Sequence, residues 1–397
     1  MSIGVPLGFR MAGVHGGLKR NPQKQDVALV LTDRAATAAG VYTQNLVFAA
    51  PVAWDRRHTP SANIRAIAIN SGNANACTGE RGDQDAARMA EIAASACGVR
   101  ADEVLVLSTG IIGEYLPMEK IERGLRQAAE RLASDEDSLV ACARGMLTTD
   151  TTHKLATRHI ELSGRRVRIT GMAKGAAMIG PRMATMLGVI LTDAPLAVDD
   201  ARRSLSEVTD QTFNCISVDG HMSTNDTVLL LANGAAGGAE LAGDELARFE
   251  HGLLEVCAEL ARSIPADGEG ATHLVTIETR GLRTAADARS VAKTVAESLL
   301  VKTAITGADP NWGRIVSAAG YAGVAFDPSK VSLKVNGTPL YDRGAPVAFD
   351  RELVSGSIRD NRDTLIELRF GEGEATSRFW TTDLTAEYVR LNADYHT

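Results

Sequence analysis

The stretch Lys174–Asp193 reads K-G-A-A-M-I-G-P-R-M-A-T-M-L-G-V-I-L-T-D and changes character near its middle. Its first half is rich in glycine and alanine, whereas Met186–Thr192 is an apolar run typical of a buried strand. Thr185 therefore stands at the head of a predicted core strand, directly after the small residue Ala184. A hydroxyl in this setting suits a nucleophile that becomes a new N-terminus. The same residues also fit a glycine-rich turn into a core strand, and taken alone they favour the turn.

Apolar runs and helical patterns follow one another along the rest of the chain. We expect strands over 26–33, 64–69, 103–108, 167–170, 227–232, 272–278, 365–370 and 376–380. We expect helices over 83–97, 117–132, 137–147, 199–212, 243–263, 285–300 and 385–391. Asn336-Gly337 between two short strand-like runs predicts a hairpin. This order predicts a mixed α/β (α+β) fold rather than a regular βαβ series.

Composition narrows the class of protein. The chain has 397 residues, enough for two domains or lobes, and a net charge of −7, which argues against nucleic-acid binding. Its five cysteines are scattered without a C-x-x-C pair, which indicates a reducing compartment rather than a disulfide or zinc scaffold. No stretch approaches the ~20 apolar residues of a membrane span, and the N-terminus lacks the order of a signal peptide. We therefore expect a cytoplasmic protein with no membrane partner and no metal.

Common catalytic signatures are missing from the sequence, among them the P-loop, the H-E-x-x-H helix and the G-x-S-x-G elbow. The loop Asn70–Gly79 lacks the lysine and spacing of a phosphate loop, so we interpret it as a tight structural turn. Cys77 within it has no basic neighbour in sequence and is a weak candidate nucleophile. The segment Asp309–Arg314, D-P-N-W-G-R, is interpreted as a turn that opens a helix.

A series of motifs in a fixed order resembles the ornithine acetyltransferase family, also called glutamate N-acetyltransferase, over nearly the whole chain. Around Thr185 the family pattern is close to K-G-S-G-M-I-x-P-N-M-A-T-M-L. The other matching segments are N-S-G-N-A-N-A-C-T-G at 70–79, S-T-G-I-I-G at 108–113, T-T-D-T at 148–151, V-D-G at 218–220, S-T-N-D at 223–226, D-G-E-G-A-T at 267–272, D-P-N-W-G-R at 309–314 and N-A-D-Y-H-T at 392–397.

The resemblance implies site residues that the pattern alone would not single out. It makes Thr185 the nucleophile, freed by self-cleavage of the Ala184–Thr185 bond, and assigns the oxyanion hole to Thr109 and Gly110. The implied substrate contacts are Thr148, Lys174, Thr185, Glu269, Asn392 and Thr397. Each of these has an ordinary structural reading by itself, because lysine and glutamate usually lie on solvated surface and chain termini usually fray.

The implied reaction is acetyl transfer from N-acetylornithine to glutamate in arginine biosynthesis, through an acetyl-threonine intermediate. No cofactor is implied, although acetyl-CoA can serve as a donor substrate in part of the family. The implied fold is a mixed α/β sandwich with two interleaved lobes, similar to N-terminal-nucleophile proteins. It is divided at the cut into an alpha chain, 1–184, and a beta chain, 185–397. Two copies of each chain would assemble.

The sequence also departs from the family pattern. Ala176-Ala177 replace Ser-Gly, Arg182 replaces Asn, and His221-Met222 stand where Asp-Thr is common. These changes bear on the efficiency of cleavage and on substrate preference. Two other functions stay open at this point: an N-terminal-nucleophile amidase or aminopeptidase that passes the acyl group to water, and a small-molecule binding protein that is never cleaved.

Overall fold

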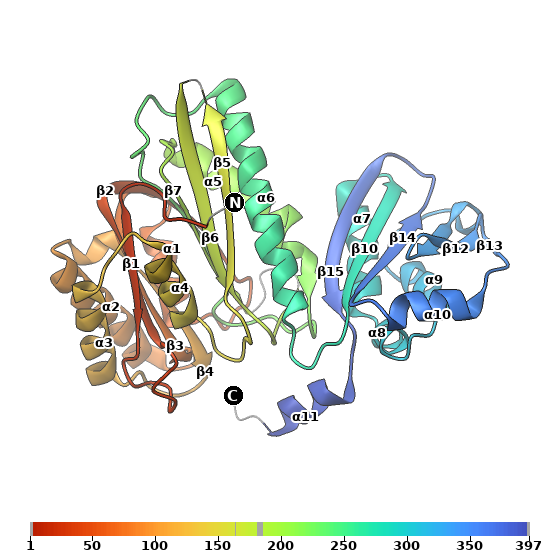
Figure 1. The fold of residues 1–397 in the computed structure, drawn as a ribbon, viewed down its shortest axis with the longest axis horizontal. Helices are drawn as coiled ribbons and strands as arrows, with labels where there is room; N and C mark the ends of the chain where they lie inside the picture. Colours follow the sequence, from red (N-terminus) through yellow and green to blue (C-terminus); the bar gives the residue numbers. More distant parts are fainter. Residues whose placement is uncertain (1–2, 163, 181–185, 395–397) are drawn as a thin grey trace.

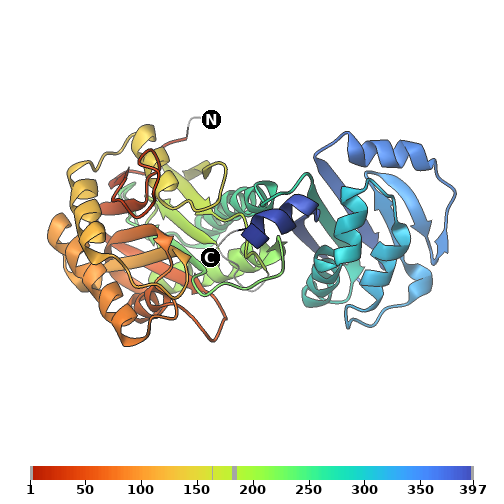
Figure 2. The ribbon, with the colours of Figure 1, turned by 90° about the horizontal axis from the view of Figure 1, so that it is seen from below.

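The computed structural model describes residues 3–162, 164–180 and 186–394. They form two lobes, each built on its own β-sheet (Figures 1 and 2). The first lobe holds the chain up to helix α6 (Gly243–Ala266), and the second begins with strand β10 (Leu274–Leu282). No helix among the described residues is long and apolar enough to cross a membrane.

The sheet of the first lobe has the strand order β4-β3-β2-β9-β7-β6-β5, with β1 paired to β2. Its strands are β1 (Phe9–Val14), β2 (Val27–Tyr42), β3 (Ser61–Asn73), β4 (Val104–Ile111), β5 (Lys154–Leu162), β6 (Arg165–Lys174), β7 (Leu187–Thr192) and β9 (Thr227–Ala232). β7 and β9 are buried along their whole length and pair in parallel. They are the centre of the sheet, as expected for continuous apolar runs.

Helices cover this sheet on both faces. α2 (Gly79–Cys97) and α3 (Met118–Glu130) pack against β2 to β4, α5 (Val198–Gln211) packs on β2 and β9, and α6 packs on β5 and β6 at the other end. α4 (Glu136–Gly145) packs on β1 and β2. Successive residues of β7 point to opposite cores, since Val189 belongs to the cluster beneath α4 and Ile190 to the cluster beneath α6.

The second lobe has the strand order β13-β12-β11-β14-β10-β15-β8. Its strands are β8 (Ile216–Ser217), β10, β11 (Ser332–Val335), β12 (Thr338–Asp342), β13 (Ala345–Pro346), β14 (Asp363–Arg369) and β15 (Ala375–Thr382). Its helices are α7 (Ala285–Glu297), α8 (Leu299–Thr306), α9 (Trp312–Gly320) and α10 (Arg351–Arg359). α7 lies on β10 and β15 and contributes Val291 and Val295 to a separate apolar core.

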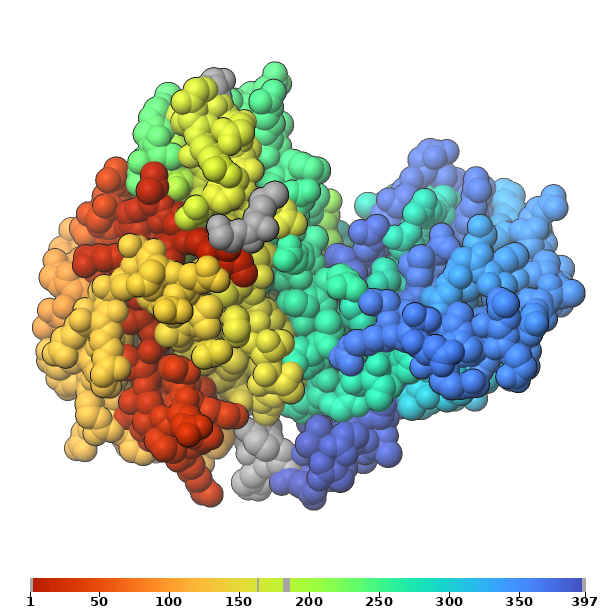
Figure 3. Space-filling model, viewed as in Figure 1, coloured from red at the N-terminus to blue at the C-terminus, as the bar shows by residue number. Residues whose placement is uncertain are grey.

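Two segments tie the lobes together. β8 lies between α5 and β9 in the sequence, yet it pairs with β15 at the edge of the second sheet. Helix α11 (Ala386–Asp394) leaves β15 and runs back beneath the junction of the lobes (Figures 1 and 2). Elsewhere the surface is hollowed between the lobes, where Glu255 of α6 and Arg378 of β15 line one groove (Figure 3).

The mixed α/β fold is confirmed, and every strand and helix expected from the sequence exists, although β2 runs on to Tyr42, well beyond the predicted end at residue 33. The hairpin at Asn336-Gly337 is confirmed, with both residues at positive φ. The elements that the sequence did not predict are β1, α1 (Ala50–His58), β5, β8, α8, β13 and α10. The boundary between lobes does not coincide with residues 184–185, because β7, β9, α5 and α6 belong to the first lobe.

Candidate functional site

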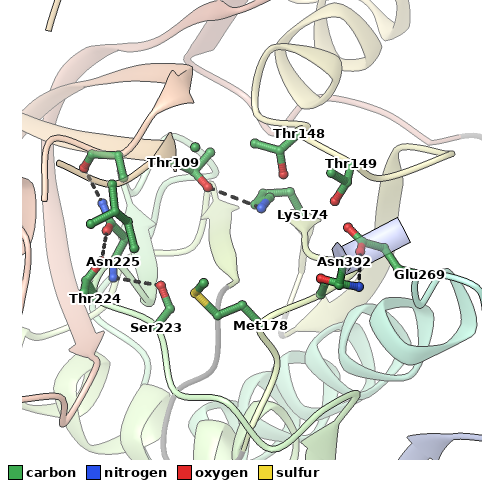
Figure 4. Close-up of a pocket in the computed structure, with 14 residues that line it drawn as sticks. Thr109, Thr148, Thr149, Lys174, Met178, Ser223, Thr224, Asn225, Glu269 and Asn392 are labelled. Atoms are coloured by element: carbon green, nitrogen blue, oxygen red, sulfur yellow. Dashed lines mark hydrogen bonds between the residues drawn. The ribbon is translucent and has the colours of Figure 1, made fainter. Parts of the chain in front are cut away.

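A pocket opens where the first sheet, the end of α6 and helix α11 meet (Figure 4). Its walls come from segments that are far apart in the sequence. The lining residues are Ala74, Thr109, Gly110, Ile112, Thr148, Thr149, Lys174, Ala177, Met178, Ser223, Thr224, Asn225, Glu269 and Asn392. All of the predicted oxyanion and substrate residues within the described parts of the chain are among them.

Thr109 and Gly110 end strand β4 beside the turn that follows β3. Gly110 has φ 137°, and a Cβ atom there would lie 2.3 Å from the carbonyl carbon of Gly72. Only glycine fits this close approach of two backbones. The turn of residues 70–79 is therefore structural, as expected, and it fixes the backbone of the predicted oxyanion donors.

Lys174 ends strand β6 and reaches the middle of the pocket, where its Nζ donates a hydrogen bond to Thr109 Oγ1 at 3.3 Å (Figure 4). Its side chain is nearly inaccessible, with 2% exposure. Burial lowers the pKa of Lys174, and Lys154 lowers it further, while the carboxylates of Asp150 and Asp226 act in the opposite direction. A cation placed here faces both the predicted oxyanion donor and the open pocket.

A buried ion network supports this cation from behind. Lys154 Nζ lies 2.8 Å from Asp150 Oδ1 and 2.6 Å from Asp267 Oδ2. Burial acts to raise the pKa of Asp150, but Lys174 and Lys154 together lower it to about 2. Asp150 also accepts the backbone N–H of Thr148 and of Gly175. The carboxylate of Asp150 thus orients both Thr148, a predicted substrate contact, and Gly175, the residue after Lys174.

Glu269 and Asn392 form the opposite wall of the pocket (Figure 4). Asn392 Nδ2 donates to Glu269 Oε2 at 3.1 Å, which links helix α11 to the loop after α6. Glu269 itself is fixed by its backbone N–H, which donates to the carbonyl of Ala176 at 2.9 Å. The pocket therefore has a cation in its middle and an anion on one wall, and the two can pair with the carboxylate and the ammonium group of an amino acid.

Asp226 lies behind the pocket and is completely buried. Its Oδ1 accepts the backbone N–H of Met186 at 3.1 Å, while its Oδ2 has no hydrogen-bond partner among the described residues. Burial raises the pKa of Asp226 well above its ordinary value, against the opposing effect of Met186 N–H and the Lys174 charge. A buried carboxyl oxygen without a hydrogen-bond partner is unusual in a protein core, and this one belongs to the side chain that holds Met186, the residue after Thr185.

The structure brings together Thr109, Gly110, Thr148, Lys174, Glu269 and Asn392 in this one pocket. Their roles remain predictions. Ala184, Thr185 and Thr397 lie outside the described residues, as does Arg182. D-P-N-W-G-R opens helix α9 as expected, with Asn311 capping it, but it is not among the pocket-lining residues.

Sequence reasoning missed several polar residues of the site, notably Thr149, Ser223 and Asn225. Asn225 Nδ2 donates to the carbonyls of Ala74 and Ser108 at 2.6 and 2.8 Å, and so ties S-T-N-D to the end of β4. The motif S-T-N-D was the available signal, because four polar residues directly precede a fully buried strand.

The departures from the family pattern fall in different places. Ala177 lines the pocket, whereas Ala176 contacts Glu269 only through its backbone carbonyl. His221 is exposed, and the Met222 carbonyl accepts a hydrogen bond from Asn45. Among the described departures, Ala177 is therefore the one that changes the surface of the pocket.

Comparison with known proteins gives consistent matches. The family model described as "ArgJ family" matches residues 10–397. The arginine biosynthesis bifunctional protein ArgJ of Rhodopirellula baltica is 45% identical over 396 residues, covering 99% of this chain and 96% of that protein. The ArgJ of Symbiobacterium thermophilum is 44% identical over 399 residues, covering 100% and 98%.

A solved structure is similar as well. The crystal structure of the arginine biosynthesis bifunctional protein ArgJ from Bacillus halodurans matches with a TM-score of 0.50 and 37% identity. That match covers 51% of this chain and 96% of the solved chain, so the solved chain is about half as long as this one.

Proposed function

This chain belongs to the ArgJ family, and from that premise we propose that its pocket transfers an acetyl group from N-acetylornithine to glutamate through Thr185. The chain is an acyltransferase of arginine biosynthesis. The observation that carries the assignment to this pocket is the convergence of Thr109, Lys174, Glu269 and Asn392, from four separate segments, on one cavity.

The charges of the pocket suit the two substrates. Both amino acids carry an α-carboxylate, for which Lys174 is the cation, and ornithine also carries a side-chain ammonium, for which Glu269 is the anion. Thr148 and Asn392 add directional hydrogen bonds. Thr397, which lies outside the described residues, is proposed as a further contact.

Maturation is proposed to begin with attack of Thr185 Oγ on the Ala184 carbonyl. The N-to-O acyl shift gives an ester, and its hydrolysis leaves residues 1–184 and a second chain that begins at Thr185. The new α-amino group has an ordinary pKa of about 7.7–8.0, so it is well placed to accept the hydroxyl proton in later turnovers. The half-length chain of the Bacillus halodurans structure supports this division.

In turnover, Thr185 Oγ attacks the acetyl carbonyl of N-acetylornithine. Negative charge develops on the carbonyl oxygen, and Thr109 and Gly110 are the proposed donors to it; one such donor is typically worth roughly 3–4 kcal/mol. The nitrogen of ornithine takes a proton and leaves, and the acetyl group stays on Thr185. The amine of glutamate then attacks this ester, so the enzyme alternates between two forms in a ping-pong sequence.

Three further points belong to the same proposal. We place the protein in the cytoplasm, and we propose that two copies of each fragment assemble. Relatives of this chain are named bifunctional proteins, and acetyl-CoA is the second donor that we propose for glutamate acetylation.

Two measurements test the proposal. A denaturing gel of the purified protein should give two fragments, and N-terminal sequencing of the second should read Thr-Met-Leu-Gly. Thr185→Ala should abolish both cleavage and transfer, whereas Thr185→Ser should retain part of each because a hydroxyl and a future amine survive. An uncut wild-type chain would favour the binding protein, and release of free acetate without acetylglutamate would favour the amidase.

A further inference from the structure

The chain just upstream of the proposed cut is held by the turn after β8. The carbonyl oxygen of Ile179 accepts three consecutive backbone N–H groups, those of Val218, Asp219 and Gly220, at 2.8, 3.2 and 3.1 Å. The carboxylate of Asp219 in turn accepts the N–H of Met178 at 2.7 Å and that of Ile179 at 2.9 Å. This reciprocal set fixes the backbone of residues 178–179.

Gly180 continues this close packing. A Cβ atom at Gly180 would lie 2.5 Å from the carbonyl carbon of Gly220, so the two backbones are in direct contact. The backbone of residues 178–180, the last described residues before the proposed cut, is therefore held in place against the turn of residues 218–220.

The chain just downstream of the proposed cut is held by Asp226 and Thr227, which follow that turn in the sequence. Asp226 Oδ1 accepts the N–H of Met186 at 3.1 Å, and the Met186 carbonyl accepts the N–H of Thr227 at 3.2 Å. Asp226 has no exposed surface, and its backbone carbonyl accepts the N–H of Thr43 at 2.9 Å. The downstream flank is thus fixed by a buried side chain that the proposed mechanism does not otherwise use.

We propose that Asp219 and Asp226 are positioning residues for self-cleavage, because the stretch of residues 217–227 holds both flanks of the Ala184–Thr185 bond. This inference rests on the proposed function. An intramolecular attack gains most of its rate from holding nucleophile and carbonyl in the right geometry, and a displacement of about 1 Å can cost about a hundredfold. Two fixed flanks separated by a short segment meet that requirement.

The two carboxylates differ in what they do after the cut. Before cleavage, both flanks are covalently joined to Thr185. Afterwards, only Met186 remains joined to it, whereas Met178 and Ile179 belong to the other fragment. After the cut, Asp219 no longer acts on Thr185 through the chain and holds only the pocket-lining Met178 and its neighbour Ile179, whereas Asp226 still holds the residue bonded to Thr185.

The experiment follows pulse-labelled full-length chains on a denaturing gel and then measures acetyl transfer with the cleaved fraction. The variants are Asp219→Ala, Asp219→Asn, Asp226→Ala and Asp226→Asn. Tyr388→Phe is the matched control, since it removes the hydroxyl that donates to Asp219 Oδ2 at 3.1 Å and leaves both bonds from Asp219 to the backbone of Met178 and Ile179 in place. The exposed Asp199→Asn controls for loss of a surface charge.

Asp219→Ala should slow cleavage on the order of a hundredfold while the fraction that is cut keeps the wild-type kcat. Asp219→Asn should slow it less, because one acceptor oxygen remains. Asp226→Ala should lower both the cleavage rate and kcat, and Asp226→Asn should restore most of both, since its amide oxygen can still accept the Met186 N–H. Both controls should be cleaved at the wild-type rate.

If wild type is cut and the alanine variants are cut equally fast, the positioning role is wrong and the proposed function stands. Loss of kcat in cleaved Asp219→Ala equal to that of Asp226→Ala would also overturn it, because a general loss of structure predicts no difference between the two. A wild-type chain that stays whole would remove the proposed maturation and this inference together. Where an alanine variant does not fold, the asparagine pair decides, since Asp226→Asn is expected to recover most of both rates and Asp219→Asn only part of the cleavage rate.

Discussion

The hydroxyl of Thr109 lies between Lys174 and the open pocket, and its contact with Lys174 decides where the hydroxyl proton points. An ammonium group has donors only, so in the 3.3 Å contact with Lys174 Nζ the Thr109 oxygen must accept. The single hydroxyl proton is then available to the pocket. Lys174 therefore acts on the reaction through Thr109 as well as on the substrate carboxylate.

A double-mutant cycle separates these two roles of Lys174. Thr109→Val should lower kcat about a hundredfold, the usual effect of losing one oxyanion donor. Lys174→Met should lower kcat on the order of tenfold in the wild-type background, because a charge-assisted hydrogen bond is lost. In the Thr109→Val background the same change should leave kcat nearly unaltered and only raise KM. Steady-state transfer by fully cleaved enzyme measures both constants.

Thr152→Val provides the control for this cycle, since its hydroxyl lies outside the pocket and donates only to the neighbouring His153 carbonyl. Equal losses of kcat from Lys174→Met in both backgrounds would mean that Lys174 does not act through Thr109.

At the scale of elements, strand β5 begins with Lys154, and a lysine at the end of a strand is usually exposed to solvent. Lys154 is instead the only cation within salt-bridge distance of Asp150 and Asp267 among the described residues. Its side chain has 1% exposure, and Thr151 donates to Asp267 through both its hydroxyl and its N–H. The network joins β5, the loop of Thr148 and the segment that leads to Glu269.

Removing this cation should destabilise the protein strongly. Lys154→Met leaves two buried carboxylates without their partner, a change that typically costs about 3–5 kcal/mol in the free energy of unfolding. Urea unfolding of the two proteins at neutral pH measures the difference. Lys293→Met is the control, because its 3.9 Å pair with Glu297 is partly exposed and should contribute less than about 1 kcal/mol.

The pH dependence of this difference has a definite sign. The pKa of Asp150 falls from its ordinary 3.8 to about 2 in the folded protein, so the stability it contributes is complete above 3.8. That stability is lost as the pH falls from 3.8 toward 2. The gap between wild type and Lys154→Met should therefore narrow over this window. A gap that stayed constant would contradict a charge-based role.

The elements also indicate where sequence reasoning ends. Runs such as Thr227–Ala232, in which five apolar residues follow one threonine, were predicted to the residue. The strand β8 has two residues and exists only because β15 lies beside it, so no local pattern could reveal it. Helix α1 has a weak apolar face and buries only Pro51, Val52 and Asp55. Its stability comes from packing, which the sequence does not display.

The site shows the same limit more strongly. Thr109, Lys174 and Glu269 are ordinary residue types at unremarkable spacings, and only their family motifs marked them. Their convergence depends on how β4, β6 and the end of α6 meet, which is a property of the whole fold. Asp150 and Lys154 were missed because buried ion pairs have no local signature.

At the scale of the whole molecule, the proposed cut passes through the middle of one sheet. β7 and β9 belong to residues 185–397, yet they lie between β2 and β6, which belong to residues 1–184. Six residue pairs join β2 to β9, and six join β6 to β7. Separating the fragments would expose two fully buried strands and break both ladders, so hydrolysis of one peptide bond should leave the fold intact.

We therefore expect the two fragments to stay together in non-denaturing buffer and to separate only with denaturant. Size-exclusion chromatography followed by a denaturing gel of the peak should show both fragments in equal amounts. The uncut Thr185→Ala chain is the control and should elute at the same volume, because the same strands hold it together. Fragments that eluted apart in native buffer would mean that the central ladder is not what joins them.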